Sequence, residues 1–171
     1  MSFSIRSPLR YPGGKSRALT QIARYIPDRF SEFREPFVGG GAVFVYFRQK
    51  FPSAKFWIND LNYELYCFWK WAQADAHKLA KEIRAVKENC SDGRALFENL
   101  TNTDTQKLTE FERAVRFFVL NRISFAHLYK WELQYGMNNY KQGKADKGQE
   151  LFIANYSVPE RAAFEQTAMP L

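Results

Sequence analysis

Hydrophobic positions in the first 62 residues follow a helical spacing in two segments and an extended pattern in two others. The first helical segment predicts a helix over residues 17–25, begun by Ser16, with an apolar face formed by Leu19, Ile22, Ala23 and Ile26. Residues 35–38 read as a strand, residues 41–49 as a second helix and residues 55–60 as a second strand. A strand, a helix and a strand in this order form a β-α-β unit, which predicts a parallel sheet.

After residue 62 the pattern becomes helical over long stretches. Residues 63–90 predict a long helix, on the apolar positions Leu65, Phe68, Trp69, Ala72, Leu79, Ile83 and Val86. Residues 91–107 are polar and predict a loop or a short helix, after which Thr109 and Glu112 form a capping-box pair for a helix running towards Phe125. We expect an α/β unit over residues 1–62 and a mostly helical region over residues 63–171.

The last part of the chain has a weaker pattern. Residues 134–150 carry glycines and lysines and predict an exposed loop, and residues 151–154 form one short strand-like piece before a polar tail.

Composition adds a candidate partner to this outline. The 171 residues are 46% hydrophobic, which is enough for a folded core in one domain. The formal net charge of +7 favours a polyanionic partner, most often nucleic acid. The chain also contains 16 Phe, 9 Tyr and 4 Trp, and part of this aromatic supply is suited to base stacking.

The cysteine and histidine residues bear on whether the protein has a metal site or disulfides. Cys67 and Cys90 lack the spacing of a zinc site or a disulfide framework, and His77 and His127 stand apart, so we expect no metal site. No apolar run approaches the length of a membrane span, and the N-terminus lacks the apolar region of a signal peptide. We therefore expect a cytoplasmic protein without a membrane partner.

The strongest chemical signal is a glycine-rich turn followed by an acid. Gly39, Gly40 and Gly41 lie between the first predicted strand and its helix, and Asp60 ends the second strand. In Rossmann-type sheets this combination holds an adenosine-containing ligand, and the carboxylate accepts hydrogen bonds from the ribose hydroxyls. Phe44 stands where a dinucleotide fingerprint has its third glycine, which disfavours a nicotinamide- or flavin-dependent oxidoreductase without excluding it. A plain glycine turn without a ligand also stays open at this point.

Four segments together carry a family resemblance. They are Leu9-Arg10-Tyr11-Pro12-Gly13-Gly14-Lys15, Glu35-Pro36-Phe37-Val38-Gly39-Gly40-Gly41-Ala42-Val43-Phe44, Asn59-Asp60-Leu61-Asn62 and Phe118-Val119-Leu120-Asn121-Arg122-Ile123-Ser124-Phe125. In this order and spacing the chain resembles the N-terminal portion of the Dam-type (D12 class) DNA adenine-N6 methyltransferases.

The resemblance implies a fold, a cofactor and a substrate. The fold would be α/β, a Rossmann-like S-adenosylmethionine-dependent methyltransferase core with an incomplete parallel sheet and a helical DNA-recognition insertion. S-adenosylmethionine would be bound by Tyr11, Lys15, Phe37, Gly39, Gly41 and Asp60, with Tyr11 stacking and Lys15 near the cofactor's polar end. DNA would be contacted by Arg122 and Lys130, and its phosphates by Lys141, Lys144 and Lys147. Beyond Phe125 the resemblance thins, because Ala126 stands where family members commonly carry a polar side chain.

The family's catalytic motif, Asp-Pro-Pro-Tyr, does not occur in the chain, because no two of its prolines are adjacent. In the family this motif hydrogen-bonds and stacks on a flipped adenine. The resemblance therefore implies no catalytic residue here and leaves three hypotheses. The chain is a truncated methyltransferase that is inactive alone; a second copy or a complementing chain supplies the missing strands; or the chain is a DNA-binding module with a vestigial cofactor pocket.

Overall fold

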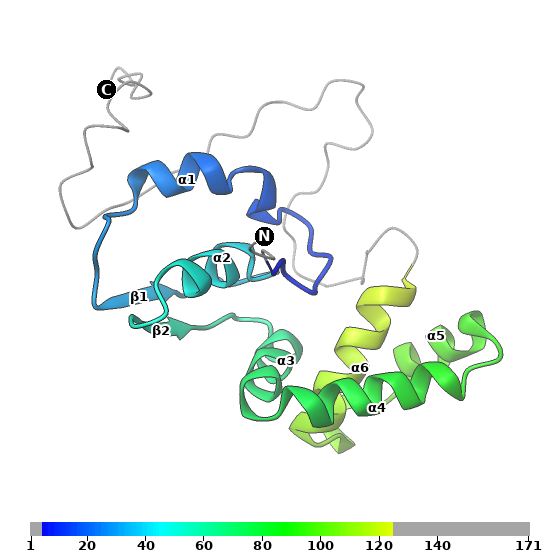
Figure 1. The fold of residues 1–171 in the computed structure, drawn as a ribbon. Coiled ribbons are helices and arrows are strands. Elements are labelled where there is room, and N and C mark those ends of the chain that lie inside the picture. Colours follow the sequence, from blue (N-terminus) through cyan, green and yellow to red (C-terminus); the bar gives the residue numbers. More distant parts are fainter. Residues whose placement is uncertain (1–4, 125–171) are drawn as a thin grey trace, which may run out of the picture.

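The computed structural model describes residues 5–124, which form two parts joined side by side (Figure 1). One part contains two strands with the helices α1 and α2, and the other contains the helices α3 to α6. The N-terminal segment, dark blue in Figure 1, runs between the two parts.

The sheet of the first part is a parallel pair. Strand β1 (Glu32–Glu35) pairs with β2 (Lys55–Ile58), with Glu32 opposite Lys55 and Glu35 opposite Ile58. Helix α2 (Ala42–Lys50) connects the two strands. The predicted β-α-β unit is therefore present. The carboxyl ends of both strands lie beside the glycine turn, where the Val38 N–H donates to the carbonyl of Asn59.

Two helices and one face of the sheet enclose an aromatic cluster. The short η1 (Lys15–Arg17) leads into α1 (Leu19–Tyr25), and α2 lies between α1 and the sheet (Figure 1). Phe47 of α2 is 1% exposed, and its ring stacks on Phe33 of β1 at 5.5 Å between ring centroids. Phe33 of β1 and Phe56 of β2 lie opposite each other in the sheet, and paired residues point to the same face, so both rings reach this cluster.

The helical part consists of α3 (Tyr63–Ala74), α4 (Ala76–Glu88), α5 (Gly93–Asn102), the short η2 (Thr105–Lys107) and α6 (Glu110–Ile123). Polar side chains cap their first turns, as expected for groups that satisfy the free N–H donors of a helix start. They are those of Asn62, Asp75, Asp92, Asp104 and Thr109.

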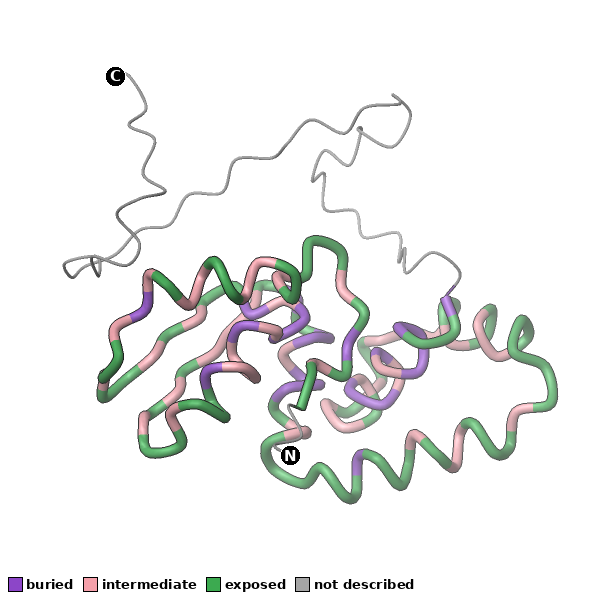
Figure 2. Tube along the Cα trace, turned by 45° about the horizontal axis from the view of Figure 1, so that its top comes forward, coloured by how far each residue is buried: buried purple, intermediate pink, exposed green. Residues whose placement is uncertain are grey.

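The core of the helical part lies around α6. Leu120 of α6 and Leu65 of α3 are both 0% exposed. Most buried residues of the helical part belong to α3 and α6 (Figure 2), whereas α4 is exposed along most of its length and buries Leu79. Leu9 and Val38 belong to the same core, so it extends into the N-terminal segment and the glycine turn.

Several predicted elements are confirmed and others are corrected. The capping box of Thr109 and Glu112 is formed, and the helix after it is α6. The first strand was predicted over residues 35–38, but β1 ends at Glu35. It ends there because the next residue, Pro36, has no N–H to donate to a neighbouring strand. The predicted helix over residues 63–90 is two helices, since Asp75 leaves the helical conformation and caps α4 with its carboxylate.

Two further elements refine the predictions, and one predicted stretch is not described. Residues 93–102 form a short helix, which was one of the two alternatives for that stretch. The first helix starts at Leu19 after a 3₁₀ turn, and no side chain caps it, so the predicted cap at Ser16 is wrong. The loop and strand predicted over residues 134–154 lie outside the described residues.

The fold class is a mixed, helix-rich arrangement with a short parallel sheet, which is consistent with a methyltransferase-like α/β fold. Within residues 5–124, no helix is both long and apolar enough to cross a membrane.

Candidate cofactor site at the glycine turn

The glycine turn connects β1 to α2 through a left-handed backbone. Gly39 has φ +48° and Gly41 has φ +70°, conformations that L side chains rarely adopt. The Gly41 N–H donates to the carbonyl of Val38 at 2.7 Å, and the Val38 N–H donates to the carbonyl of Asn59 at 2.9 Å. The turn is thereby attached to the chain that leaves β2.

Asp60 closes this site from the second strand. Its Oδ2 accepts the Gly39 N–H at 2.9 Å, and its Oδ1 accepts the Asn62 N–H at 3.0 Å. The carboxylate therefore joins the glycine turn to the start of α3. The structure brings together two residues, Gly39 and Asp60, that the sequence pattern assigned to one site.

Trp69 of α3 explains why Gly41 has no side chain. A Cβ at Gly41 would lie 2.3 Å from Cζ2 of the indole, well inside contact distance. The indole Nε1–H donates to the carbonyl of Gly39 at 3.2 Å. Trp69 is thus packed against one glycine and hydrogen-bonded to another, which holds α3 against the turn.

Tyr11 covers the turn from the N-terminal segment. A Cβ built at Gly39 would lie 3.3 Å from Cδ1 and Cε1 of the tyrosine ring, and one at Gly40 would lie 2.9 Å from the Tyr11 Cβ. Burial, together with the nearby Asp60 carboxylate, raises the pKa of Tyr11, while a hydrogen bond with Asn62 acts in the opposite direction. The ring is therefore a neutral, half-buried surface beside the acid.

Glu35 adds a second carboxylate at the end of β1. Burial raises the pKa of Glu35 to about 7; a hydrogen bond from the Phe44 main chain opposes this shift and the Asp60 charge adds to it. Its Oε2 is buried without a hydrogen-bond partner. Glu35 and Asp60 thus place two interacting acids at the carboxyl ends of the two strands.

Replacing Glu35 by glutamine is expected to change how stability depends on pH. The ordinary pKa is 4.5 and the folded one about 7, so the folded chain binds more protons between these values and wild-type stability falls as pH rises through this window. Glu35→Gln removes that loss and should raise the free energy of unfolding at pH 8 by about 2 kcal/mol, with little gain at pH 4. Urea denaturation at both pH values measures the effect.

Glu32→Gln is the matched control, because Glu32 lies exposed on the same strand. A gain for Glu35→Gln of equal size at pH 4 and pH 8 would show that burial of the carboxylate is not its cause.

The other predicted cofactor residues surround the turn less closely. Phe37 is 80% exposed at the start of the turn, where a ligand can reach its ring. Lys15 begins η1, directly after the turn in which the Gly14 N–H donates to the carbonyl of Tyr11. The assignment of these residues to a cofactor remains a prediction.

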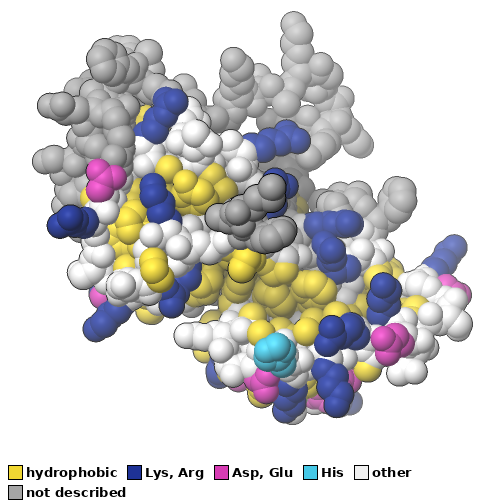
Figure 3. Space-filling model, in the orientation of Figure 1, with side chains coloured by type: hydrophobic (Ala, Val, Ile, Leu, Met, Phe, Trp, Pro, Cys, Tyr) yellow, Lys and Arg dark blue, Asp and Glu magenta, His cyan; other side chains and the backbone are white. Residues whose placement is uncertain are grey.

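The predicted DNA-contacting residues are only partly described. Arg122 is exposed near the end of α6, with its guanidinium 5.9 Å from the Phe118 ring centroid. Lys130, Lys141, Lys144 and Lys147 lie outside the described residues. Figure 3 shows Lys and Arg side chains spread over one face of the molecule rather than gathered in one patch.

Sequence reasoning missed Glu35 and Trp69 at the site, and also Asn121 of α6, whose side-chain amide is hydrogen-bonded to the main chain of Arg10 beside Tyr11. Glu35 lies in the same segment as the glycines, but alternation alone does not reveal that its carboxyl group is buried. Trp69 has the spacing of a core residue, and Asn121 is a polar residue on an apolar helix face, which was the available signal. Within residues 5–124, no group of three or more His, Cys, Asp or Glu side chains could hold a metal ion.

Comparison with known proteins gives a consistent result. The sequence model of the D12 class N6 adenine-specific DNA methyltransferases matches residues 11–162. The Type II methyltransferase M.MjaIII of Methanocaldococcus jannaschii is 30% identical over 160 residues, which cover 84% of this chain and 55% of that protein. The DNA N-6-adenine-methyltransferase of Escherichia phage P1 is 34% identical over 142 residues, covering 80% of this chain and 18% of that protein.

A further relative is the DNA adenine methylase of Escherichia coli strain K12, which is 29% identical over 132 residues, covering 75% of this chain and 45% of that protein. The chain thus spans about half the length of two of these relatives and a smaller share of the phage protein. The family match covers most of the chain and includes the glycine turn, Asp60 and α6. This chain belongs to the D12 class of N6 adenine-specific DNA methyltransferases.

Proposed function

We propose that the glycine turn binds S-adenosylmethionine and that α6 carries part of the DNA-contacting surface of an adenine-N6 methyltransferase. The observation that carries this proposal is the hydrogen bond from the Gly39 N–H to Asp60 at 2.9 Å. It places an acid and a bare stretch of backbone together at the carboxyl ends of two parallel strands, which is where open α/β sheets bind their ligands.

The charge of the site suits this cofactor. S-adenosylmethionine carries a sulfonium and an ammonium group, so a lining with acidic side chains favours it. Glu35 and Asp60 lie close enough for the charge of Asp60 to raise the pKa of Glu35. The buried Oε2 of Glu35, which has no hydrogen-bond partner in the structure, offers an acceptor to a cationic group.

A dinucleotide fits the same turn less well. In dinucleotide-binding folds the pyrophosphate sits on the free N–H groups at the start of the first helix. Here the Phe44 N–H, in the first turn of α2, already donates to the Glu35 carboxylate. A pyrophosphate would meet that carboxylate and Asp60, which disfavours the oxidoreductase alternative.

Each side chain at the turn has a role in this proposal. Asp60 accepts the ribose hydroxyls, because a carboxylate offers about four acceptor positions and its two hydrogen bonds to main-chain N–H groups leave others free. Tyr11 and the exposed ring of Phe37 provide apolar surfaces for stacking. Gly39 and Gly41 let the ligand approach the backbone, and Lys15 lies near the cofactor's polar end.

For DNA, we propose that the exposed Arg122 contacts the duplex and that Lys130, Lys141 and Lys144 contribute further contacts. Contacts of this kind to phosphates raise affinity without reading sequence.

The bound cofactor would supply an electrophilic methyl group. The 171 residues hold no adjacent prolines, so we propose that the residues presenting the adenine come from another stretch of polypeptide, either a longer form of this chain, a second copy or a complementing chain.

Asp60→Ala is expected to weaken S-adenosylmethionine binding at least about tenfold, because it removes hydrogen bonds to a charged acceptor that each contribute about 1.5–3 kcal/mol. Isothermal titration calorimetry of the wild type and the variant measures this change. Asp92→Ala is the matched control, since Asp92 caps α5 in the helical part and should leave affinity unchanged.

The same titrations separate the alternatives. Binding of NAD or FAD in preference to S-adenosylmethionine would favour the oxidoreductase. No binding of any of the three by the wild type would favour a DNA-binding module with a vestigial pocket. Unchanged affinity for S-adenosylmethionine in Asp60→Ala would refute the proposed contact of Asp60 with the ribose hydroxyls, but not cofactor binding at the glycine turn.

A further inference from the structure

We propose that Asn121 is a positioning residue for the cofactor site: its amide clamps the main chain of Arg10 and so places Tyr11 over the glycine turn. The inference rests on the proposed function, since it assigns Asn121 an effect on cofactor binding. It concerns a side chain on α6, in the helical part.

The clamp uses both ends of one side-chain amide. Oδ1 of Asn121 accepts the Arg10 N–H at 3.0 Å, and Nδ2 donates to the Arg10 carbonyl at 2.6 Å. Asn121 is 4% exposed. One buried side chain therefore makes the two hydrogen bonds that a neighbouring β-strand would make with Arg10. Its partner lies 111 residues away in the sequence.

The segment from Ser7 to Tyr11 is fixed at two more points. The Ser7 hydroxyl donates to the carbonyl of Gly40 and accepts the Leu9 N–H. Leu9 is 8% exposed and belongs to the core shared with α3 and α6. Ser7 thus attaches the segment to the glycine turn, while Leu9 and the clamp attach it to the helical part.

Tyr11 follows the clamped residue directly. On its other side, the Gly14 N–H donates to the Tyr11 carbonyl at 3.0 Å and closes a turn. The ring lies within 3.3 Å of the Cβ position at Gly39, so a small displacement of the segment would change the space above the turn. The clamp and this turn together determine where the ring stands.

The amide is matched to its partner in a way that an apolar side chain could not be. The neighbouring Leu120 is fully buried in the core, but an apolar side chain at residue 121 would leave the Arg10 N–H and carbonyl without these two hydrogen bonds. The direction of the two hydrogen bonds also fixes one position of the Arg10 main chain. The next residue, Arg122, is the proposed DNA contact, so the end of α6 carries both functions.

Titration with S-adenosylmethionine tests the proposal at a temperature where every variant is folded. Asn121→Ala is expected to raise the Kd about tenfold. Tyr11→Ala should raise it by a similar factor, and the double variant should bind no more weakly than Tyr11→Ala. Leu79→Ala, at a core position of α4 that is 3% exposed, is the control for lost stability and should leave the Kd unchanged.

Two variants at Arg10 test the clamp without altering α6. Arg10→Pro removes the N–H that Oδ1 accepts, and Arg10→Ala removes only an exposed side chain. Arg10→Pro should raise the Kd, and Arg10→Ala should not. Hydrogen exchange at Arg10, without cofactor, should become at least tenfold faster in Asn121→Ala.

The outcomes separate this inference from the proposed function. A wild type that does not bind S-adenosylmethionine overturns the proposed function. A wild type that binds, with unchanged affinity in Asn121→Ala and in Arg10→Pro, overturns the positioning role alone. Additive effects of Asn121→Ala and Tyr11→Ala would show that Asn121 does not act through Tyr11.

Discussion

Gly41→Ala is expected to lower the free energy of unfolding by about 3–5 kcal/mol, which combines backbone strain with overpacking. The φ of Gly41 is +70°, and the added Cβ would lie 2.3 Å from Cζ2 and 2.7 Å from Cη2 of Trp69. The indole cannot move away freely, because its Nε1–H donates to the Gly39 carbonyl and Trp69 is only 9% exposed. Urea denaturation followed by circular dichroism gives the change.

Two other glycines separate the causes of this loss. Gly13 has φ +72° with no atom within 4 Å of its Cβ position, so Gly13→Ala should cost only the strain, about 1 kcal/mol. Gly93, at the first position of α5, has open space and a negative φ, so Gly93→Ala should be neutral or slightly stabilising. A cost for Gly41→Ala equal to that of Gly13→Ala would show that the contact with Trp69 is relieved without penalty.

Glu64→Gln is expected to cost about 3 kcal/mol, because it leaves two largely buried guanidinium groups without their counter-charge. Glu64 of α3 accepts a hydrogen bond from Arg113 of α6 and lies 3.5 Å from Nη1 of Arg116. The side chains of Arg113 and Arg116 are 15% and 11% exposed. Glutamine has nearly the same volume, so the substitution isolates the loss of charge.

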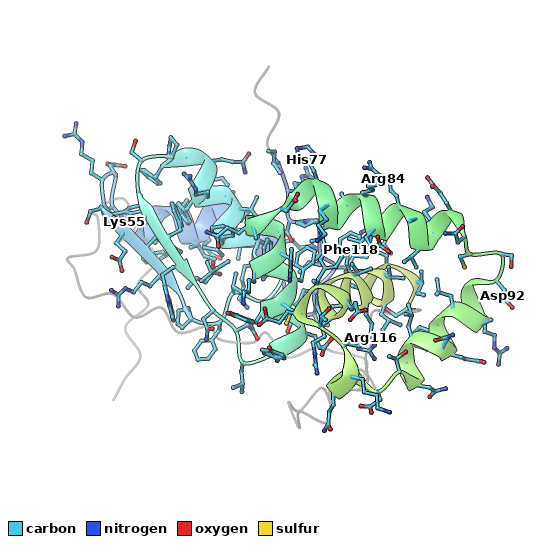
Figure 4. All side chains as sticks on the ribbon, turned by 90° about the horizontal axis from the view of Figure 1, so that it is seen from below. Lys55, His77, Arg84, Asp92, Arg116 and Phe118 are labelled. Atoms are coloured by element: carbon cyan, nitrogen blue, oxygen red, sulfur yellow. The ribbon has the colours of Figure 1, made fainter. Side chains whose placement is uncertain are left out.

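The arginines also link the acid to the rest of the helical part. Arg113 donates to the carbonyl of Thr105 in η2, and Arg116 donates to the carbonyl of Leu100 in α5 at 2.7 Å. Figure 4 labels Arg116 on α6. Loss of the charge at Glu64 should therefore loosen α5 and η2 as well as α3. Hydrogen exchange in α5 would report this second effect.

The exposed pair of Arg94 and Glu98 is the control for Glu64→Gln. Its side chains are 89% and 59% exposed, so Glu98→Gln should change stability by less than about 0.5 kcal/mol. An equal cost for the two substitutions would contradict the assigned role of burial.

Local sequence signals predicted many elements of this fold. Periodicity and capping residues located α2, β2 and α6, and the capping box at Thr109 placed the start of α6. The errors arose where one residue outweighed a longer pattern. Pro36 ended β1 early, and Asp75 interrupted a helical pattern by capping the next helix.

The family and the spacing between the glycine turn and Asp60 were readable from the order of the residues alone. Which groups meet near that turn became clear from the folded arrangement: Trp69 against Gly41, the buried carboxyl group of Glu35, and Asn121 on the main chain of Arg10. Periodicity indicates which face of an element is buried, but it does not indicate what packs on that face. Contacts between distant segments, such as α6 and the N-terminal segment, depend on the packing of one shared core, to which Leu9 and Val119 both belong.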